Sequence, residues 1–141
     1  MTTRTVLFAV LAAASLPAMA QGMQPGQWQF TTTMTSPMMQ QPQVGTTSKC
    51  VSKAEADDPP SFMGGDNAAG CDITRGASAP GNYSWTIACQ QQGVTGTGKA
   101  SFGLTEFESE IRMTVTMKEG GQKIDMTNRT VGRYLGPCKA K

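Results

Sequence analysis

The sequence predicts an all-β protein, an antiparallel meander that forms a curved sheet or a partly closed barrel of roughly six to eight strands. Several segments alternate apolar and polar residues with a period of two, which is typical of strands with one buried face. Clusters of Gly, Pro and Asn separate these segments. A single short segment carries a helix signal, and four cysteines predict two disulfides.

The first predicted strand begins at Gly26, after residues 21–25 (QGMQP), which we interpret as a loose terminus. Polar residues alternate along it with residues that share the other face, namely Trp28, Phe30, Thr32 and Met34. This pattern of aromatic and β-branched residues indicates a half-buried strand. A polar loop that contains Pro37 and Pro42 follows, and residues 43–50 predict a second strand.

The helix signal follows this second strand. Ser52 and Glu55 have the Ser-x-x-Glu spacing of a capping box, in which each end of the motif satisfies a backbone N–H of the other. The motif predicts a short helix over about residues 53–57, which Pro59 would end. Residues 58–70 (DPPSFMGGDNAAG) predict a loop.

The next two predicted strands favour one pairing of the cysteines. Cys71 and Ile73 alternate in one strand, and Tyr83, Trp85, Ile87 and Cys89 alternate in the next. A register with Cys71 opposite Cys89 also sets Ile73 opposite Ile87, and opposed Cα atoms in such a pair lie within disulfide range. We therefore favour Cys71–Cys89, which leaves Cys50–Cys138; the other connectivities remain open.

The last predicted hairpin has one apolar face over residues 107–117 and a two-residue turn at Gly120-Gly121. This turn sets Met117 opposite Ile124, Val115 opposite Met126, and Phe107 opposite Tyr134. It also sets Arg112 opposite Arg129, a like-charge pair that is unfavourable. A bulge near Arg129 would relieve the repulsion.

The N-terminus has the three parts of a secretory signal peptide. Arg4 precedes an apolar run over residues 6–16, and Ala18-Met19-Ala20 has the small residues of a cleavage site. We expect residues 1–20 to be removed after Ala20, with a single β domain, residues 21–141, in the periplasm. The apolar run is shorter than the roughly 20 residues that a membrane span needs, and no second long run follows, so we expect no membrane span.

The charge balance argues against a polyanionic partner. The net charge is +2, and removal of Arg4 leaves +1. A domain with so small a charge exerts little long-range attraction on nucleic acid, so we expect no nucleic-acid partner.

Several motifs together resemble a known family of exported bacterial proteins. They are Gly26-x-Trp28 at the start of a Thr-rich strand, Cys50 after the second strand, Cys71, Trp85-x-x-x-Cys89, and the closing segment 132–138 (GRYLGPC). Over residues 23–138 the chain resembles the DUF3617 family, whose function is unknown. The resemblance implies an exported protein with this cysteine framework, and it implies no catalytic residue.

The composition argues against an enzyme. The chain has no His, and if all four cysteines are oxidised no thiolate remains, so the usual general bases, nucleophiles and metal ligands are missing. The segment Gly93 to Ala100 (GVTGTGKA) nearly matches a P-loop, but Ala100 replaces the Mg²⁺-binding hydroxyl and no helix is predicted after it. We expect no catalytic residue and no cofactor.

Methionine is the compositional oddity, and it suggests one metal hypothesis. Met34, Met38 and Met39 lie around Pro37, and thioethers are soft ligands that select Cu(I). The favoured interpretation is that methionines on inward strand faces fill the core. A weak copper site at these three residues is a minor alternative, and otherwise we expect no metal.

Two interpretations of the function remain. The first is an uncharacterised, non-catalytic periplasmic protein that acts as a structural or interaction module of the envelope, with an unknown envelope protein as its partner. The second is a module that binds a small apolar ligand or lipid in the concavity of the sheet. The aromatic residues that would line such a site are Trp28, Phe30, Trp85, Phe102 and Phe107. The simpler interpretation of these aromatic residues is that they form the core of the domain.

Overall fold

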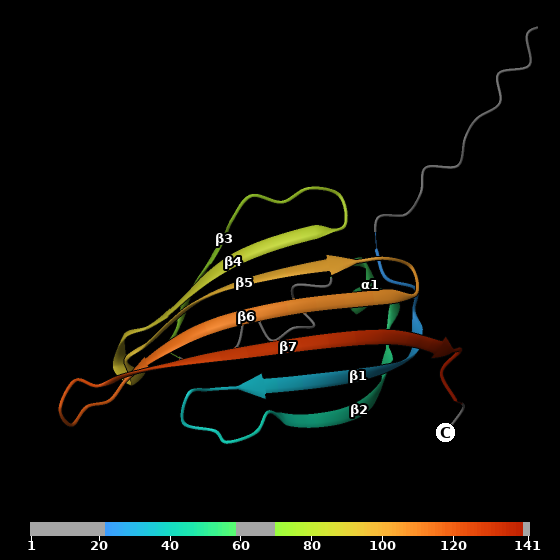
Figure 1. Ribbon diagram of the computed structural model, residues 1–141. Coiled ribbons are helices and arrows are strands. Elements are labelled where there is room, and N and C mark those ends of the chain that lie inside the picture. The colour runs from blue at the N-terminus through green and yellow to red at the C-terminus, as the bar shows by residue number, and fades with distance from the viewer. Residues whose placement is uncertain (1–21, 59–69, 140–141) are drawn as a thin grey trace, which may run out of the picture.

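The computed structural model describes residues 22–58 and 70–139. They form a seven-stranded antiparallel sheet with one helix and one 3₁₀ turn (Figure 1). The strands are β1 (Gly26–Thr35), β2 (Gln43–Val51), β3 (Asp72–Arg75), β4 (Asn82–Cys89), β5 (Val94–Phe102), β6 (Glu106–Thr116) and β7 (Lys123–Gly136). The helix is α1 (Lys53–Asp57) and the 3₁₀ turn is η1 (Gln90–Gln92). The predicted signal peptide lies outside the described residues.

The sheet is curved and does not close, so the curved-sheet prediction is confirmed and the partly closed barrel is not the form adopted. The strand order is β2-β1-β7-β6-β5-β4-β3. Strands β3 to β7 follow one another as a meander, and β1 lies between its hairpin partner β2 and the last strand, β7. The connection that contains α1 therefore links strands at opposite edges of the sheet.

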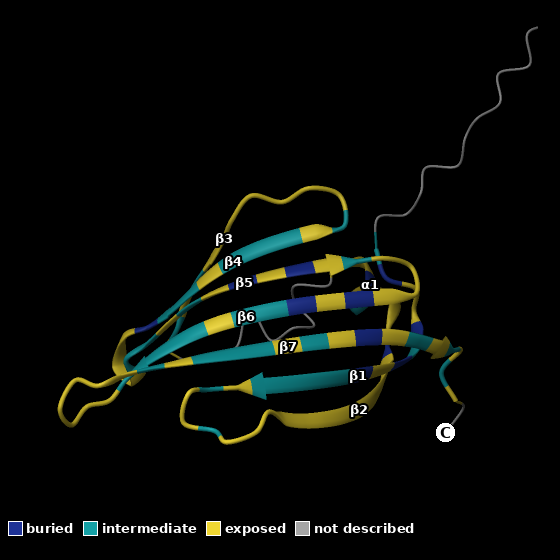
Figure 2. Cartoon of the chain, in the orientation of Figure 1, coloured by how far each residue is buried: buried dark blue, intermediate teal, exposed yellow. Residues whose placement is uncertain are grey.

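The period-two pattern of β1 puts its aromatic residues in the core. Trp28 is 0% exposed and Phe30 is 6% exposed, and Phe30 lies opposite Gly132 on β7. We call the side of the sheet that carries these residues the inner face. The buried positions of β5, β6 and β7 gather toward the end of the sheet at which α1 lies (Figure 2). The core cluster consists of Met23, Trp28, Phe30, Val51, Ala56, Ala100 and Phe107.

The helix has the predicted capping box. The Glu55 backbone N–H donates to the Ser52 Oγ at 3.3 Å, and the Ser52 backbone N–H donates to Glu55 Oε2 at 2.9 Å. Ala56, on the opposite side of this short helix, is fully buried in the core cluster. The cap thus starts α1 at Lys53, and the burial of Ala56 anchors the helix to the inner face.

The pairing of β6 with β7 differs by two residues from the predicted register. Val115 lies opposite Ile124, Met113 opposite Met126, and Phe107 opposite Gly132. The predicted turn glycines, Gly120 and Gly121, do have positive φ values of 80° and 63°, but they lie in a longer loop closed by the Met117 N–H bond to the Gln122 carbonyl at 2.8 Å.

This shift removes the expected charge conflict. Arg129 lies opposite Glu110, while Arg112 lies opposite Thr127. Arg129 also pairs with Glu108, its Nε donating to Glu108 Oε1 at 3.0 Å. The β6–β7 ladder runs without a register shift, so the bulge expected near Arg129 is absent from it. A slip of two residues preserves the face of every side chain, and the apolar pattern is satisfied equally well in both registers.

Two disulfides join the pairs that the strand register favours. Cys71–Cys89 ties the start of β3 to the end of β4, and Ile73 lies opposite Ile87 as expected. Cys50–Cys138 ties β2 to the segment just beyond the end of β7, across the intervening β1. Both edges of the sheet are therefore held covalently.

Candidate functional site

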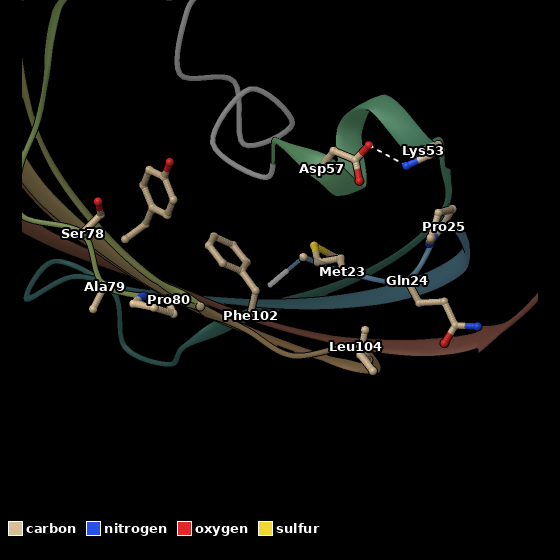
Figure 3. A pocket seen from close by; sticks show the side chains of 13 residues that line it. Met23, Gln24, Pro25, Lys53, Asp57, Ser78, Ala79, Pro80, Phe102 and Leu104 are labelled. Atoms are coloured by element: carbon tan, nitrogen blue, oxygen red, sulfur yellow. Dashed lines mark hydrogen bonds and ion pairs between the residues drawn. The ribbon is translucent and has the colours of Figure 1, made fainter. Parts of the chain in front are cut away.

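An open pocket of about 980 Å³ is found at the α1 end of the sheet. It lies between α1, the segment before β1 and the loop that leads into β4 (Figure 3). Its apolar lining consists of Met23, Pro25, Pro80, Tyr83, Phe102 and Leu104. The pocket volume is within the usual range for small-molecule sites, roughly 300–1,000 Å³.

The segment before β1 forms one wall because backbone hydrogen bonds hold it in place. The Met23 N–H donates to the Ala56 carbonyl at 3.3 Å, and the Gln24 N–H donates to the Leu104 carbonyl at 3.0 Å. The indole N–H of Trp28 donates to the Gln24 carbonyl at 2.8 Å. The described part of this segment is therefore not the loose terminus that the sequence suggests, and Met23 is only 3% exposed.

The opposite wall is the loop between β3 and β4. Gly81 adopts a φ of +72°, and its carbonyl accepts the Phe102 N–H at 2.7 Å, which brings the loop against the end of β5. Ala79 pairs with Asn82 in an isolated bridge that holds Pro80 at the turn. The Phe102 ring contacts the Tyr83 ring edge to face, with the two centroids 5.9 Å apart. These contacts fix the position of the loop against the end of β5.

The charged groups of the lining lie at one side of this pocket. Lys53 Nζ lies 2.8 Å from Asp57 Oδ2, and both side chains project from α1 at the rim, as Figure 3 shows. Their side chains are 80% and 63% exposed, so the pair contributes little to stability, of order 0–1 kcal/mol. Because their own attraction is weak, both charges remain available to a polar group of a ligand.

The five aromatic residues predicted to line a ligand site divide between core and pocket. Trp28, Phe30 and Phe107 are buried in the core cluster, where Phe30 contacts Phe107 edge to face at a centroid distance of 5.7 Å. Phe102 is half-buried and lines the pocket. Trp85 is half-buried beside the core cluster and does not line this pocket.

The P-loop-like segment has a structural role. Its first glycine, Gly93, ends η1 with a φ of +65°, and the rest of the segment belongs to β5. Gly98 lies opposite Trp85, and a Cβ at Gly98 would be 2.1 Å from an atom of the Trp85 ring. The absence of a side chain at Gly98 therefore leaves room for the Trp85 ring to lie against β5.

The methionines proposed for copper lie at the far end of β1. Met34 is half-buried on the inner face near the end of this strand, while Met38 and Met39 lie in the turn that follows it. Met38 is 69% exposed. The described residues hold no group of three or more His, Cys, Asp or Glu side chains arranged to bind a metal ion.

One carboxyl group has a strongly shifted pKa. The hydrogen bond from Lys49, and then those from the Ser52 backbone and hydroxyl, lower the pKa of Glu55 from 4.5 to about 2. Lys49 Nζ lies 2.6 Å from Glu55 Oε1. This carboxylate serves the helix cap and the link from α1 to β2, and it does not line the pocket.

Three pocket residues are not predictable as such from the sequence, namely Met23, Tyr83 and Leu104. Met23 precedes the first alternating segment, and Leu104 lies in the turn between β5 and β6, so neither belongs to a periodic pattern. The alternation in β4 predicts Tyr83 on the inner face, and it lies there, opposite the buried Ala100, but its neighbours in the pocket come from distant segments. The only local signal for the pocket in the sequence is that Met23 and Leu104 are apolar although they lie outside the alternating segments.

Within the two described ranges, no helix is both long and apolar enough to cross a membrane. Neither the curated proteins nor the proteins of solved structure include a match to this chain. The sequence model of one family, described as a protein of unknown function (DUF3617), matches residues 23–138. That match covers most of the chain and includes the sheet, all four cysteines and all of the pocket lining except Gly22. The chain therefore belongs to the DUF3617 family.

Proposed function

We propose that the protein is an exported, non-catalytic module of the bacterial envelope that binds a small, largely apolar molecule in the pocket at the α1 end of the sheet. The observation that carries this proposal is the lining, in which apolar side chains from three separate segments face one hollow while the charged groups stay on α1. Small-molecule sites commonly combine an apolar lining with a few polar groups that orient the ligand.

The pocket favours a ligand with an apolar body and one polar end. Met23, Phe102 and Leu104 supply apolar contact area, whereas Lys53 and Asp57 lie together at the rim. A medium-chain acyl group with a carboxylate or a similar head fits this division. Burial of each CH₂ group of such a chain contributes about 0.8 kcal/mol, so about ten buried CH₂ groups approach the roughly 8 kcal/mol of micromolar binding before the cost of association is subtracted.

Export is supported by the signal-like N-terminus and by the disulfides. Both cysteine pairs are bonded, and disulfides persist in oxidising compartments such as the periplasm. A non-catalytic role is supported by the composition, since the chain has no His and the described cysteines are all in disulfides. The shifted carboxyl, Glu55, is engaged in the helix cap.

The experiment begins with native mass spectrometry of the protein taken gently from a periplasmic extract. The expected result is a mass above that of the chain beginning at Gln21, with the excess lost on denaturation. The delipidated protein is then titrated with dodecanoate, and the fluorescence of Trp28 is followed in a Trp85→Phe background. Trp28 reports on the site because its indole donates to the carbonyl of Gln24, a lining residue.

A matched pair of leucines supplies the control. Leu104 lines the pocket and is 54% exposed, whereas Leu135 lies outside it and is 57% exposed. We expect Leu104→Asn to raise the dissociation constant for dodecanoate about fivefold or more, and Leu135→Asn to leave it unchanged. Equal effects of both substitutions, or no saturable binding together with a bare native mass, would refute the proposal.

A second candidate is the structural or interaction module, in which a protein partner replaces the small ligand. The observation that favours it is the exposed edge strand β2, whose residues are exposed from Gln43 to Cys50. An edge of this kind is suited to strand addition. Its test is crosslinking in the intact envelope: a second protein crosslinked to β2 supports this candidate, and crosslinks to copies of this chain alone, or none, contradict it.

A further inference from the structure

We propose that β2 pairs antiparallel with β2 of a second copy of this chain, which gives a two-fold symmetric dimer with one continuous sheet. The proposal goes beyond ligand binding and rests on a different part of the molecule. It concerns the edge of the sheet formed by β2, which we call the β2 edge. Among residues 22–58 and 70–139, β2 pairs only with β1.

The β2 edge has few of the features that normally protect an edge strand. Proteins block such edges with charges, prolines, bulges or very short strands, because unpaired N–H and C=O groups otherwise recruit another chain. β2 is nine residues long, and its register with β1 runs without a shift from Gln43 to Val51. Pro42 lies just before the strand, and Lys49 is its only charged residue.

The single charge on β2 is already compensated. Lys49 Nζ lies 2.6 Å from Glu55 Oε1 on α1, and the Lys49 side chain is 45% exposed. The stretch from Gln43 to Ser48 is therefore an uncharged segment with the β-branched residues Val44, Thr46 and Thr47. Such residues favour strand pairing.

The sequence of β2 is compatible with its own reverse. If the two-fold axis passes through Thr46, then Gly45 lies opposite Thr47, Val44 opposite Ser48, and Gln43 opposite Lys49 of the other copy. The two Lys49 residues are then about 20 Å apart along the strands, at about 3.3 Å per residue, which exceeds the screening length at physiological salt. No like charges face each other in this register.

The centre of the proposed interface extends a contact already present within one chain. The hydroxyl oxygens of Thr31 and Thr46 lie 3.4 Å apart on neighbouring strands. Thr46 of the second copy would continue this row on the same face of the sheet. Thr–Thr cross-strand pairs are among the favourable ones.

The other edge of the sheet explains why the assembly stops at two copies. β3 has only four residues, and Asp72 and Arg75 are its two ends. A β2-to-β3 contact between copies would pair few residues and would generate an open chain of molecules. The two-fold β2 contact pairs a full strand with itself and is closed, as in most homo-oligomers.

Sedimentation equilibrium of the full mature chain, with its disulfides intact, tests the proposal at concentrations from about 1 μM to 1 mM. The expected result is a reversible monomer–dimer equilibrium. Hydrogen exchange should show protection of β2 amides that rises with protein concentration. A chain that stays monomeric throughout, or β2 amides equally protected at every concentration, would overturn the inference.

Two matched variants locate the interface. Thr46→Lys places two ammonium groups opposite each other at the two-fold axis, and it is expected to raise the dimer dissociation constant about tenfold or more. Thr95→Lys adds the same charge at an exposed position of β5, away from the β2 edge, and should leave the constant unchanged. Thermal unfolding followed by circular dichroism establishes that both variants fold. A dimer that survives Thr46→Lys would place the contact elsewhere and refute β2 pairing.

Discussion

Gly132 of β7 lies against the two aromatic rings at the centre of the core, which makes its substitution by alanine a sharp test of the packing. A Cβ at this position would lie 2.7 Å from Phe30 Cε1 and 3.0 Å from Phe107 Cβ. Tight but tolerated contacts begin near 3.0–3.4 Å, so the Phe30 ring has to move by several tenths of an ångström. Phe30 is 6% exposed and Phe107 is 3% exposed, so neither has free space to move into.

We expect Gly132→Ala to lower the free energy of unfolding by about 1–2 kcal/mol. Overpacking of a filled core costs about 1–3 kcal/mol, and part of this is offset because alanine reduces the entropy of the unfolded chain by about 0.4–1 kcal/mol. For a domain of this size the melting temperature should fall by about 4–8 °C. Urea unfolding and thermal unfolding, both followed by circular dichroism, measure the effect.

Gly45→Ala is the matched control. Gly45 also lies in a strand on the inner face, opposite Thr32, but nothing lies within 4 Å of a Cβ built there. This variant should be as stable as the natural chain or more stable by up to about 1 kcal/mol. If Gly132→Ala and Gly45→Ala have the same stability, the argument that Gly132 is required by close aromatic packing is wrong.

Three further predictions follow from the same structure. Replacing Cys50 and Cys138 with serine should cost about 4–5 kcal/mol in urea unfolding, because that disulfide closes a loop with a sequence separation of 88; a loss below about 1 kcal/mol would contradict the loop-entropy argument. The depressed pKa of Glu55, about 2, means that its contribution to stability is complete above pH 4.5 and is lost as the pH falls toward 2. Glu55→Gln should therefore be less stable than the natural chain near pH 6, with the difference shrinking below pH 4.5; a difference that does not depend on pH would contradict this. Gly98→Ala should displace the ring of Trp85 and shift its fluorescence emission to longer wavelength, and an unchanged spectrum would show that the ring does not rest on this glycine.

Local features of the fold were predictable from the sequence because their determinants lie within a few residues of one another. The Ser52–Glu55 spacing predicted a helix of the observed length, since both hydrogen bonds of the cap lie inside one turn. The alternation around Trp28 predicted the buried face of β1, because it too is a pattern within a few consecutive residues. The Cys71–Cys89 pairing followed from the facing patterns of two neighbouring strands.

The β6–β7 register was predicted incorrectly because two registers that differ by two residues bury the same side chains. The choice between them depends on the length of the loop around Gly120 and on charge. Opposite charges at Glu110 and Arg129 favour the observed register, and this pairing was the usable signal in the sequence.

The pocket could not be predicted because it depends on how distant segments meet. Met23, Tyr83 and Leu104 belong to three segments, and only the hydrogen bonds of the segment before β1 and of the loop before β4 bring them together. A periodic pattern shows which face a residue occupies. It does not show which other segments will cover that face.

The position of β1 beside β7 has a consequence for how the chain acquires its structure. Residues 27–35 find their second partner only in residues 127–136, about a hundred positions later, so β1 cannot complete its pairing until nearly the whole chain is present. Contacts of such long range slow folding, because the loop between them must close first. A chain that leaves a ribosome or a translocation channel from its N-terminus therefore presents the β1–β2 hairpin, with its aromatic side uncovered, throughout most of its emergence. Acquisition of the native sheet is consequently a late, whole-chain event, and C-terminal truncations that remove β7 should leave no stable remnant.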